Sequence, residues 1–356
     1  MRTIAAVSAA AVMAAAASWP QGAAADDFSF TVVAGHPPIT AGVAAIRDFF
    51  IPEVNRRLEE AGGNHTITWN EAYAGALADV QGVLEAVEGG VGDFGYVPHL
   101  FEADKLPLEQ ITYVTPFGSA DLKTMMRLVR DLHDEVPEMA QAWRDNNQLM
   151  LAAVGVDTYH LATTFPVESV EDISGRKLST AGLQTNWLRG TGAVPVAGAL
   201  PDYYNAIQTG LTEGTVTFGS AMAPYKFFEV APHITKVNFG AQSASALTVN
   251  LDVWEGLPDD LKEIIQQVAI EYQDYAADNY TNSAEKSLNI AAEGGAKIKE
   301  ASDEMRAGFA NAMPNIALEW AKSLDDRGVP GTKALEAYLR LSEEAGVSFS
   351  RNWLAE

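Results

Sequence analysis

The chain has 356 residues, of which 47% are hydrophobic, and it carries a formal net charge of −23 and no cysteine. Such acidity repels phosphate backbones and argues against nucleic-acid binding, so we interpret it as a solvated surface. The lack of cysteine excludes disulfides, thiolate catalysis and cysteine-ligated metal sites. The length predicts about two domains.

The N-terminal segment has the pattern of a secretory signal peptide. Arg2 is followed by an apolar run over 4–18, and three small residues, Ala23 to Ala25, offer a cleavage site. We therefore predict a signal peptide over 1–25 and export to the periplasm. No later stretch is long and apolar enough to span a bilayer.

The next part of the chain alternates strands with helices. Strands are predicted over 28–34 and 66–70 and at 92–96. A helix is predicted over 39–58, and a second one follows the strand at 66–70 and ends at Gly89-Gly90. This β-α-β-α-β order predicts a parallel sheet.

The segment 170–218 continues the alternation with shorter elements. We predict strands over 176–180 and 193–196 and a two-turn helix over 183–189, closed by Gly190. Pro201 begins a further helix that ends near Gly210, with Tyr204, Ile207 and Leu211 on its apolar face. Ligands of such sheets bind beyond the carboxyl ends of the strands, so this is a predicted ligand-binding unit.

Four pieces of this segment, in this order and spacing, resemble the signature of the solute-binding proteins of TRAP transporters. They are Asp172-Ile-Ser-Gly-Arg-Lys-Leu178, Gly192-Ala-Val-Pro-Val196, Tyr204-Asn-Ala-Ile-Gln-Thr-Gly210 and Glu213-Gly214. The resemblance implies an α/β fold of the two-lobed periplasmic binding protein type (type II-like). Two α/β domains would be joined by hinge crossings, and a long C-terminal helical segment would follow.

The resemblance also implies a domain layout. Lobe I would comprise 26–150 and about 245–275, lobe II would comprise 151–244, and long helices over about 260–356 would brace both lobes. Strands are expected over 111–114 and 148–156, with strands at 234–239 and 246–250 returning to the first lobe. The permease in the membrane would be the partner, the ligand would be captured by hinge closure, and we expect a monomer.

Three ligand positions depart from the family pattern. Where the family places an arginine that clamps a carboxylate with two hydrogen bonds, this chain has Ser179. A second arginine position falls on Tyr159, and an asparagine position falls on Thr217, ahead of Phe218 where proline is usual. These departures weaken the case for C4-dicarboxylates and acidic sugars.

Aromatic and hydroxyl side chains replace the missing charge at predicted strand ends and helix starts: His36, Trp69, Tyr73, Tyr96, His99, Tyr159, Ser179, Trp187, Thr217 and Phe218. Such surfaces suit a flat, weakly polar ligand. Backbone N–H groups near Leu183 to Thr185, with the hydroxyls of Ser179 and Thr185, could hold one carboxylate. We therefore predict a small aromatic monocarboxylate of the benzoate type.

Two of the candidate residues also have a structural interpretation. Trp187 lies on a predicted helix, where packing is the favoured role. Arg189 is a candidate substitute for the missing arginine, but its position on the helix favours a surface salt bridge.

Other ligands and functions stay open. A dicarboxylate or sugar acid could use Arg189, and a small amine could pair with Glu71 or Asp93 while stacking on aromatic rings. A periplasmic enzyme on the same fold or a ligand sensor for a membrane receptor are the competing classes. The sequence has no Gly-x-Ser-x-Gly, His-Glu-x-x-His or Walker motif and no i, i+4 histidine pair, so we predict neither a catalytic residue nor a cofactor or metal.

Overall fold

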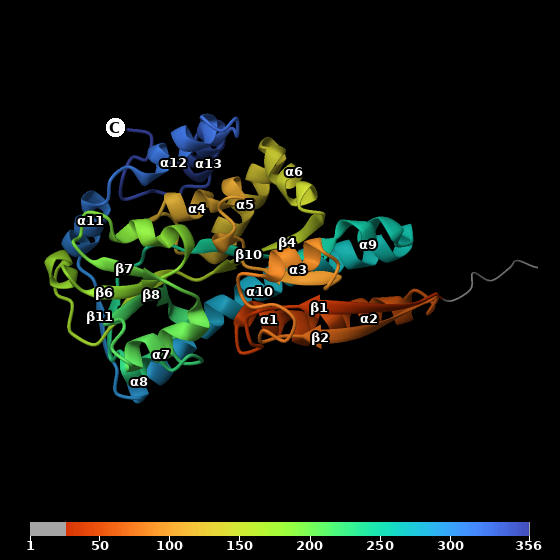
Figure 1. The fold of residues 1–356 in the computed structure, drawn as a ribbon, viewed down its shortest axis with the longest axis horizontal. Helices are drawn as coiled ribbons and strands as arrows, with labels where there is room; N and C mark the ends of the chain where they lie inside the picture. The colour runs from red at the N-terminus through yellow and green to blue at the C-terminus, as the bar shows by residue number, and fades with distance from the viewer. Residues whose placement is uncertain (1–25, 356) are drawn as a thin grey trace, which may run out of the picture.

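The computed structural model describes residues 26–355, which form two mixed sheets with helices around them (Figure 1). The predicted signal peptide lies outside the described residues. The first sheet has the order β2-β1-β3-β10-β4. Its strands are β1 (Asp26–Val33), β2 (His65–Ala72), β3 (Phe94–Val97), β4 (Gln148–Val156) and β10 (Gln242–Asn250). We call this sheet and the helices α1 to α6 and α9 lobe I.

The second sheet has the order β11-β9-β5-β8-β6-β7. Its strands are β5 (Tyr159–Thr163), β6 (Lys177–Thr180), β7 (Val194–Ala197), β8 (Gly214–Phe218), β9 (His233–Lys236) and β11 (Lys297–Glu300). With helices α7 and α8 it forms lobe II. The two-lobed α/β fold predicted from the sequence is confirmed.

The helices cover both sheets. They are α1 (Ala41–Ala45), α2 (Ile51–Glu60), α3 (Val83–Glu88), α4 (Ile111–Val114), α5 (Leu122–Glu135), α6 (Glu138–Asp145), α7 (Tyr203–Gln208), α8 (Phe227–Val230), α9 (Leu251–Gly256), α10 (Asp259–Glu293), α11 (Asp303–Ala312), α12 (Ile316–Asp325) and α13 (Gly331–Glu344). Short 3₁₀ turns, among them His99–Phe101, Gly182–Leu188 and Gly219–Ala221, connect several of them. Among the described residues we find no helix that is both long and apolar enough to cross a membrane.

Local sequence explains the first β-α-β unit. Over 65–69 every second residue of the edge strand β2 is partly buried, and Trp69 packs against Phe30, Phe94 and Phe50 with ring centroids 5.2–5.9 Å apart. Pro52, near the start of α2, lacks the N–H that an uninterrupted α-helix needs. The turn directly before α2, Ile46–Phe50, is accordingly a π-helix that connects α1 to α2.

Two short chain crossings lie side by side between the lobes, and α10 makes a further connection from α9 of lobe I to β11 of lobe II. Asp157 and Thr158 lead from β4 to β5, and residues 237–241 lead from β9 back to β10. The N–H of Gly240 donates to the Thr158 hydroxyl at 3.0 Å, and the N–H of Phe239 donates to the Tyr159 carbonyl at 3.1 Å. These bonds fasten the crossings to each other, so they form a two-stranded hinge.

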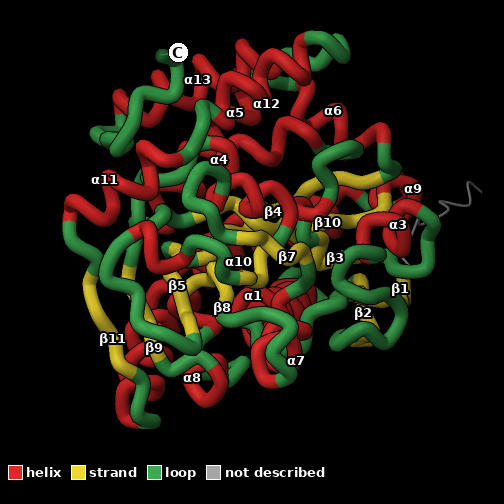
Figure 2. The backbone as a smooth tube through the Cα atoms, turned by 60° about the vertical axis from the view of Figure 1, so that its left-hand side comes forward, coloured by secondary structure: helices red, strands yellow, loops and turns green. Residues whose placement is uncertain are grey.

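The helix α10 runs past both lobes (Figures 1 and 2). Its 35 residues span about 52 Å at the usual rise of about 1.5 Å per residue. It contacts α1, α2 and β4 in lobe I and β11 and the Gly219–Ala221 turn in lobe II. Leu261, Ile265, Val268 and Tyr272 are buried on its inner face, as their helical spacing predicts.

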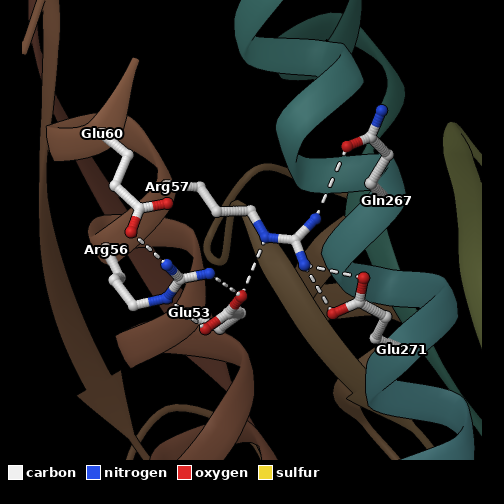
Figure 3. Close-up of polar contacts among 6 residues, drawn as sticks. All are labelled: Glu53, Arg56, Arg57, Glu60, Gln267 and Glu271. Atoms are coloured by element: carbon white, nitrogen blue, oxygen red, sulfur yellow. Dashed lines mark hydrogen bonds and ion pairs between the residues drawn. The ribbon is translucent and has the colours of Figure 1, made fainter. Parts of the chain in front are cut away.

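An ion-pair network joins α10 to α2 (Figure 3). The Arg57 guanidinium donates to Glu53 on its own helix at 2.8 Å and to Glu271 on α10 at 2.6 Å. Its third contact, with Gln267, measures 3.5 Å. Arg56 beside it pairs only with Glu53 and Glu60 of α2 among the residues drawn.

The C-terminal helices α12 and α13 pack against each other and against α4 and α5 of lobe I (Figure 2). Arg189, next to the Gly182–Leu188 turn of lobe II, donates to Glu319 of α12 at 2.5 Å. These helices therefore contact elements of both lobes.

Three expectations from the sequence are wrong. Ile111–Val114 forms α4 and not a strand, because a short apolar run has no period and here continues the Pro107–Gln110 turn. β9 pairs with β5 and β11, so it belongs to lobe II and does not return to lobe I. In α7 the buried face is Tyr203 and Ile207, whereas Leu211 follows the helix and is exposed.

Candidate ligand-binding site

A small cavity lies between the two lobes, with about 40 Å³ open to the centre of a water-sized sphere. Lobe I contributes residues from the loops after β1 and β3 and from β10, lobe II contributes β8 and the segments around β6 and α7, and α10 contributes one tyrosine. The lining consists of His36, Thr40, Tyr96, Leu100, Phe101, Val156, Tyr159, Ala181, Gln184, Leu200, Tyr203, Val216, Thr217, Phe218, Ala244, Ser245 and Tyr280.

No lining side chain carries a full charge at neutral pH. Among residues 26–355, no Arg, Lys, Asp or Glu lines the cavity. Asp157, the acid of the first crossing, lies outside the lining and accepts the N–H of Ser220 at 3.1 Å. Burial raises the pKa of Asp157 to about 7. The cavity therefore presents rings, methyl groups and a few neutral hydrogen-bonding groups.

His36 is the histidine of the cavity. It follows β1, is 7% exposed, and its ring meets the Tyr96 ring edge-on with centroids 5.8 Å apart. Its Nδ1 is buried without a hydrogen-bond partner in the described part of the chain. Burial lowers the pKa of His36 to about 4, so the imidazole is neutral near pH 7.

Tyrosine hydroxyls form one side of the cavity. The Tyr96 and Tyr280 oxygens lie 3.2 Å apart and bring β3 of lobe I against α10. Burial raises the pKa of both hydroxyls, so both stay protonated. Each hydroxyl can therefore donate a hydrogen bond to a ligand acceptor or accept a hydrogen bond from the other tyrosine.

Tyr159 lies at the hinge, at the start of β5. Its hydroxyl is 2.9 Å from that of Tyr113, and its ring packs edge-on against Phe218 and Trp187. Trp187 donates its indole N–H to the Tyr113 carbonyl at 2.7 Å and stacks on Phe239. Trp187 thus packs behind the lining residue Tyr159 and does not line the cavity itself, in the packing role that the sequence favours.

Thr217 and Phe218 occupy the end of β8, opposite His160 and Tyr159 of β5. The Thr217 hydroxyl oxygen is buried and finds no hydrogen-bond partner among residues 26–355. Gln184 differs, because its amide accepts from the Ala181 N–H and donates to the Val216 carbonyl, both at 2.9 Å. Thr217 is therefore a lining residue with an unpaired hydroxyl, whereas both polar atoms of the Gln184 amide bond the backbone.

Of the predicted anion cradle, Ser179, Leu183 and Thr185 are not in the cavity lining, whereas Gln184 between them is. The Ser179 hydroxyl is 3.0 Å from that of Thr212, and the Thr185 hydroxyl donates to the Gly182 carbonyl at 2.7 Å. Arg189 forms the surface ion pair that the sequence favours, with Glu319. Ligand binding by these three residues stays a prediction.

Three other candidates also lie outside the lining. Trp69 donates to Asn55 at 3.0 Å within the aromatic cluster of lobe I. His99 is fully buried, with Nε2 3.3 Å from the Ser243 hydroxyl, and Tyr73 is partly buried after β2. His36, Tyr96, Tyr159, Thr217 and Phe218 are the predicted residues that the fold brings together.

Other residues of the cavity were not predicted from the sequence, among them Thr40, Leu100, Tyr203, Ser245 and Tyr280. Thr40 and Tyr203 directly precede or begin helices after predicted loops, which is a signal that could have been used. Tyr280 continues the buried face of α10, and its spacing is the same as that of core residues. The packing of α10 against both lobes brings it to the cavity.

The lobes touch beside the cavity. The oxygens of Thr40 in lobe I and Tyr225 in lobe II lie 2.7 Å apart. Gly182 of lobe II has φ +48°, and a Cβ built on it would lie 2.2 Å from the Leu100 carbonyl oxygen of lobe I. The structure is therefore a form in which the lobes are in contact.

Two lobes, a double crossing and a cavity between them define a periplasmic-type solute-binding protein. Residues 54–323 match the bacterial extracellular solute-binding proteins of family 7, DctP. The chain belongs to this family, whose members are binding receptors.

Relatives in the same family share a moderate identity. The C4-dicarboxylate-binding periplasmic protein DctP of Rhodobacter capsulatus is 29% identical over 50% of this chain and 54% of its own length. The ectoine-binding periplasmic protein TeaA of Halomonas elongata is 24% identical over 73% of this chain and 74% of its own. This chain thus spans about half the length of the first relative and three quarters of the second.

Solved structures share the fold. A TRAP solute-binding protein of Rhodoferax ferrireducens, in complex with copurified benzoate, superposes with a TM-score of 0.79 at 17% identity and covers 89% of this chain and 98% of its own. DctP7 of Bordetella pertussis, which binds pyroglutamic acid, gives 0.74 at 17% identity, with 87% and 99% covered. At these identities the likeness concerns the fold.

Proposed function

We propose that this protein is the periplasmic solute receptor of a TRAP transporter. It captures a small organic acid between its lobes and delivers it to a permease in the membrane. Family membership and the cavity at the hinge support this role. Capture works by closure, because a ligand that contacts both lobes binds the closed form better than the open one.

We infer further that the ligand is an aromatic monocarboxylate of the benzoate type. The observation that carries this inference is the composition of the cavity, in which aromatic rings surround a space without a charged side chain. Flat rings bind such surfaces by stacking and by burial of apolar area. The benzoate complex of the Rhodoferax protein supports the same ligand class on this fold.

Other acids are the second candidate, because structural neighbours carry pyroglutamate and sugar acids. A dicarboxylate would need a counter-charge at each end, and the described lining supplies none. A small amine is less well supported. Glu71 is exposed on β2, and Asp93 accepts the N–H of Thr31 at 2.7 Å, so neither lines the cavity.

A thermal-shift screen of residues 26–356 tests the ligand class, with benzoate, succinate, glucuronate, pyroglutamate and ectoine as probes. A ligand at about 100 times its dissociation constant adds about 2.7 kcal/mol to the free energy of unfolding. We expect benzoate to raise the melting temperature. A rise with succinate alone would reject the aromatic monocarboxylate.

A deletion strain tests the transport role. Loss of ligand uptake supports delivery to a permease. Intact uptake together with a lost cellular response to the ligand would instead favour a sensing partner.

A further inference from the structure

Two polar atoms of the cavity have no partner. His36 Nδ1 and Thr217 Oγ1 are buried, and neither forms a hydrogen bond within residues 26–355. They belong to opposite lobes, since His36 follows β1 and Thr217 lies in β8, and both residues line the cavity. Unpaired buried polar atoms are costly, so a ligand that pairs with both would be favoured.

A carboxylate faces an electrostatic problem in this cavity. Transfer of an anion from water into a buried site is unfavourable unless a positive charge or a proton accompanies it. The described lining holds no cation. The lining tyrosines already hold their protons, so within the described lining the neutral imidazole of His36 is the side chain with a ring nitrogen free to accept one.

We propose that the receptor captures a monocarboxylate together with one proton from solution, shared between the ligand carboxyl group and Nδ1 of His36, while Thr217 donates to the second carboxyl oxygen. This inference rests on the proposed function, in which the ligand is an organic acid. The charges balance, because the carboxylate brings −1, the proton brings +1 and the imidazole is neutral before binding. No covalent bond other than that to the proton forms or breaks.

The surroundings of His36 agree with an imidazole that is uncharged until the ligand arrives. Burial alone lowers its pKa, and no charged side chain contributes. The titratable groups on the packed elements are Tyr73 after β2, Tyr96 on β3 and Tyr280 on α10, and burial raises the pKa of each. On β2 and in the π-helix, Glu71, Arg47 and Asp48 are exposed.

This arrangement also sets a specificity. One shared proton neutralises one carboxylate, so a dicarboxylate would keep an uncompensated charge inside the cavity. Terephthalate and para-toluate test this point as a pair, because they have the same ring and similar length and differ in the second carboxylate. We expect para-toluate to bind at least tenfold more tightly.

Isothermal titration calorimetry measures the proton directly. Benzoate is titrated into the wild-type protein at pH 7 in phosphate and in Tris, whose ionisation heats differ. The difference in observed heat should correspond to uptake of nearly one proton per ligand. Between pH 6 and 8 the dissociation constant should rise close to tenfold per pH unit. Pyroglutamate serves as a second probe.

Substitutions test which residue holds the proton that is taken up with the ligand. His36→Gln should abolish both the proton uptake and the pH slope, whereas Thr217→Val should weaken binding and keep the slope. Asp157→Asn is the matched control, because burial raises the pKa of Asp157 to about 7 and it lies outside the lining. That variant should keep the slope.

Each result on the wild-type protein decides the matter even if a variant fails to fold. Tight binding of benzoate or pyroglutamate without proton uptake overturns this inference alone and leaves the proposed receptor function standing. Failure of every monocarboxylate to bind between pH 5.5 and 8.5 overturns this inference together with the proposed monocarboxylate ligand. A pH slope that disappears in Asp157→Asn and persists in His36→Gln assigns the proton elsewhere and also overturns it.

Discussion

The Thr40 hydroxyl and the Tyr225 hydroxyl lie 2.7 Å apart and join the two lobes beside the cavity. Thr40 precedes α1 of lobe I, and Tyr225 stacks on Phe227 in lobe II with ring centroids 5.7 Å apart. The bond exists only while the lobes are in contact. It therefore stabilises the closed form and should slow ligand release.

Tyr225→Phe should weaken ligand binding by about two- to thirteenfold, because a net hydrogen bond contributes about 0.5–1.5 kcal/mol. The effect should fall on the dissociation rate, measured by stopped-flow fluorescence. Tyr204→Phe is the control, since its hydroxyl bonds Glu229 within lobe II. Equal rates for the wild type and Tyr225→Phe would contradict a role in closure.

Gly182→Ala should hold the lobes apart. The new Cβ would lie 2.2 Å from the Leu100 carbonyl oxygen, and a backbone atom cannot move aside as a flexible side chain can. We expect more than tenfold weaker binding and, in small-angle scattering with ligand, a larger radius of gyration than in the wild type. Gly210→Ala has a similar positive φ, +75°, but open space around it, so it separates backbone strain from the clash.

The buried pair Glu109–His133 should make stability depend on pH. Glu109 Oε1 lies 2.9 Å from His133 Nε2 and 2.8 Å from the Trp143 indole nitrogen. Burial alone would raise the pKa of Glu109, but attraction to His133 prevails and lowers it to about 2. Burial opposes the charge on His133 as well, yet attraction to Glu109 raises its pKa above 6.5.

The sign follows from these directions. The His133 contribution is complete below pH 6.5 and is lost as the pH rises through its raised pKa, whereas the Glu109 contribution is complete above pH 4.5 and is lost toward pH 2. Urea unfolding from pH 4 to 9 should therefore show the largest stability difference between the wild type and His133→Gln near pH 5–6. A difference that grows from pH 6 to 9 would contradict this account.

Arg57→Met should loosen the attachment of α2 to α10, because the guanidinium bridges Glu53 and Glu271 (Figure 3). Glu271 is 48% exposed, so solvent screens the pair and the loss should stay below about 1 kcal/mol. Added salt should reduce the difference in urea unfolding. Arg56→Met is the matched control, because its drawn partners all lie on its own helix, and it should cost less.

The sequence predicted the helices and strands that have a clear hydrophobic period. It also predicted those site residues whose positions follow from the match to the family motif. The strand predicted over 148–156 is β4, and the motif register brought Tyr159, Thr217 and Phe218 into the cavity lining. Ser179 has the same kind of register, but its hydroxyl turns to Thr212, a contact that local sequence does not contain. The interlobe pairs depend on tertiary geometry, since Thr40 and Tyr225 are 185 positions apart.

The continuity of α10 limits how the molecule can move. A single helix of 35 residues contacts both lobes and also contributes Tyr280 to the cavity. Such a rod does not lengthen, so separation of the lobes has to proceed as a swing around its axis or a slip along it. The two lobes would then rotate about one common helix. Every ligand-bound molecule would therefore present its lobes to the proposed permease in the same relative orientation.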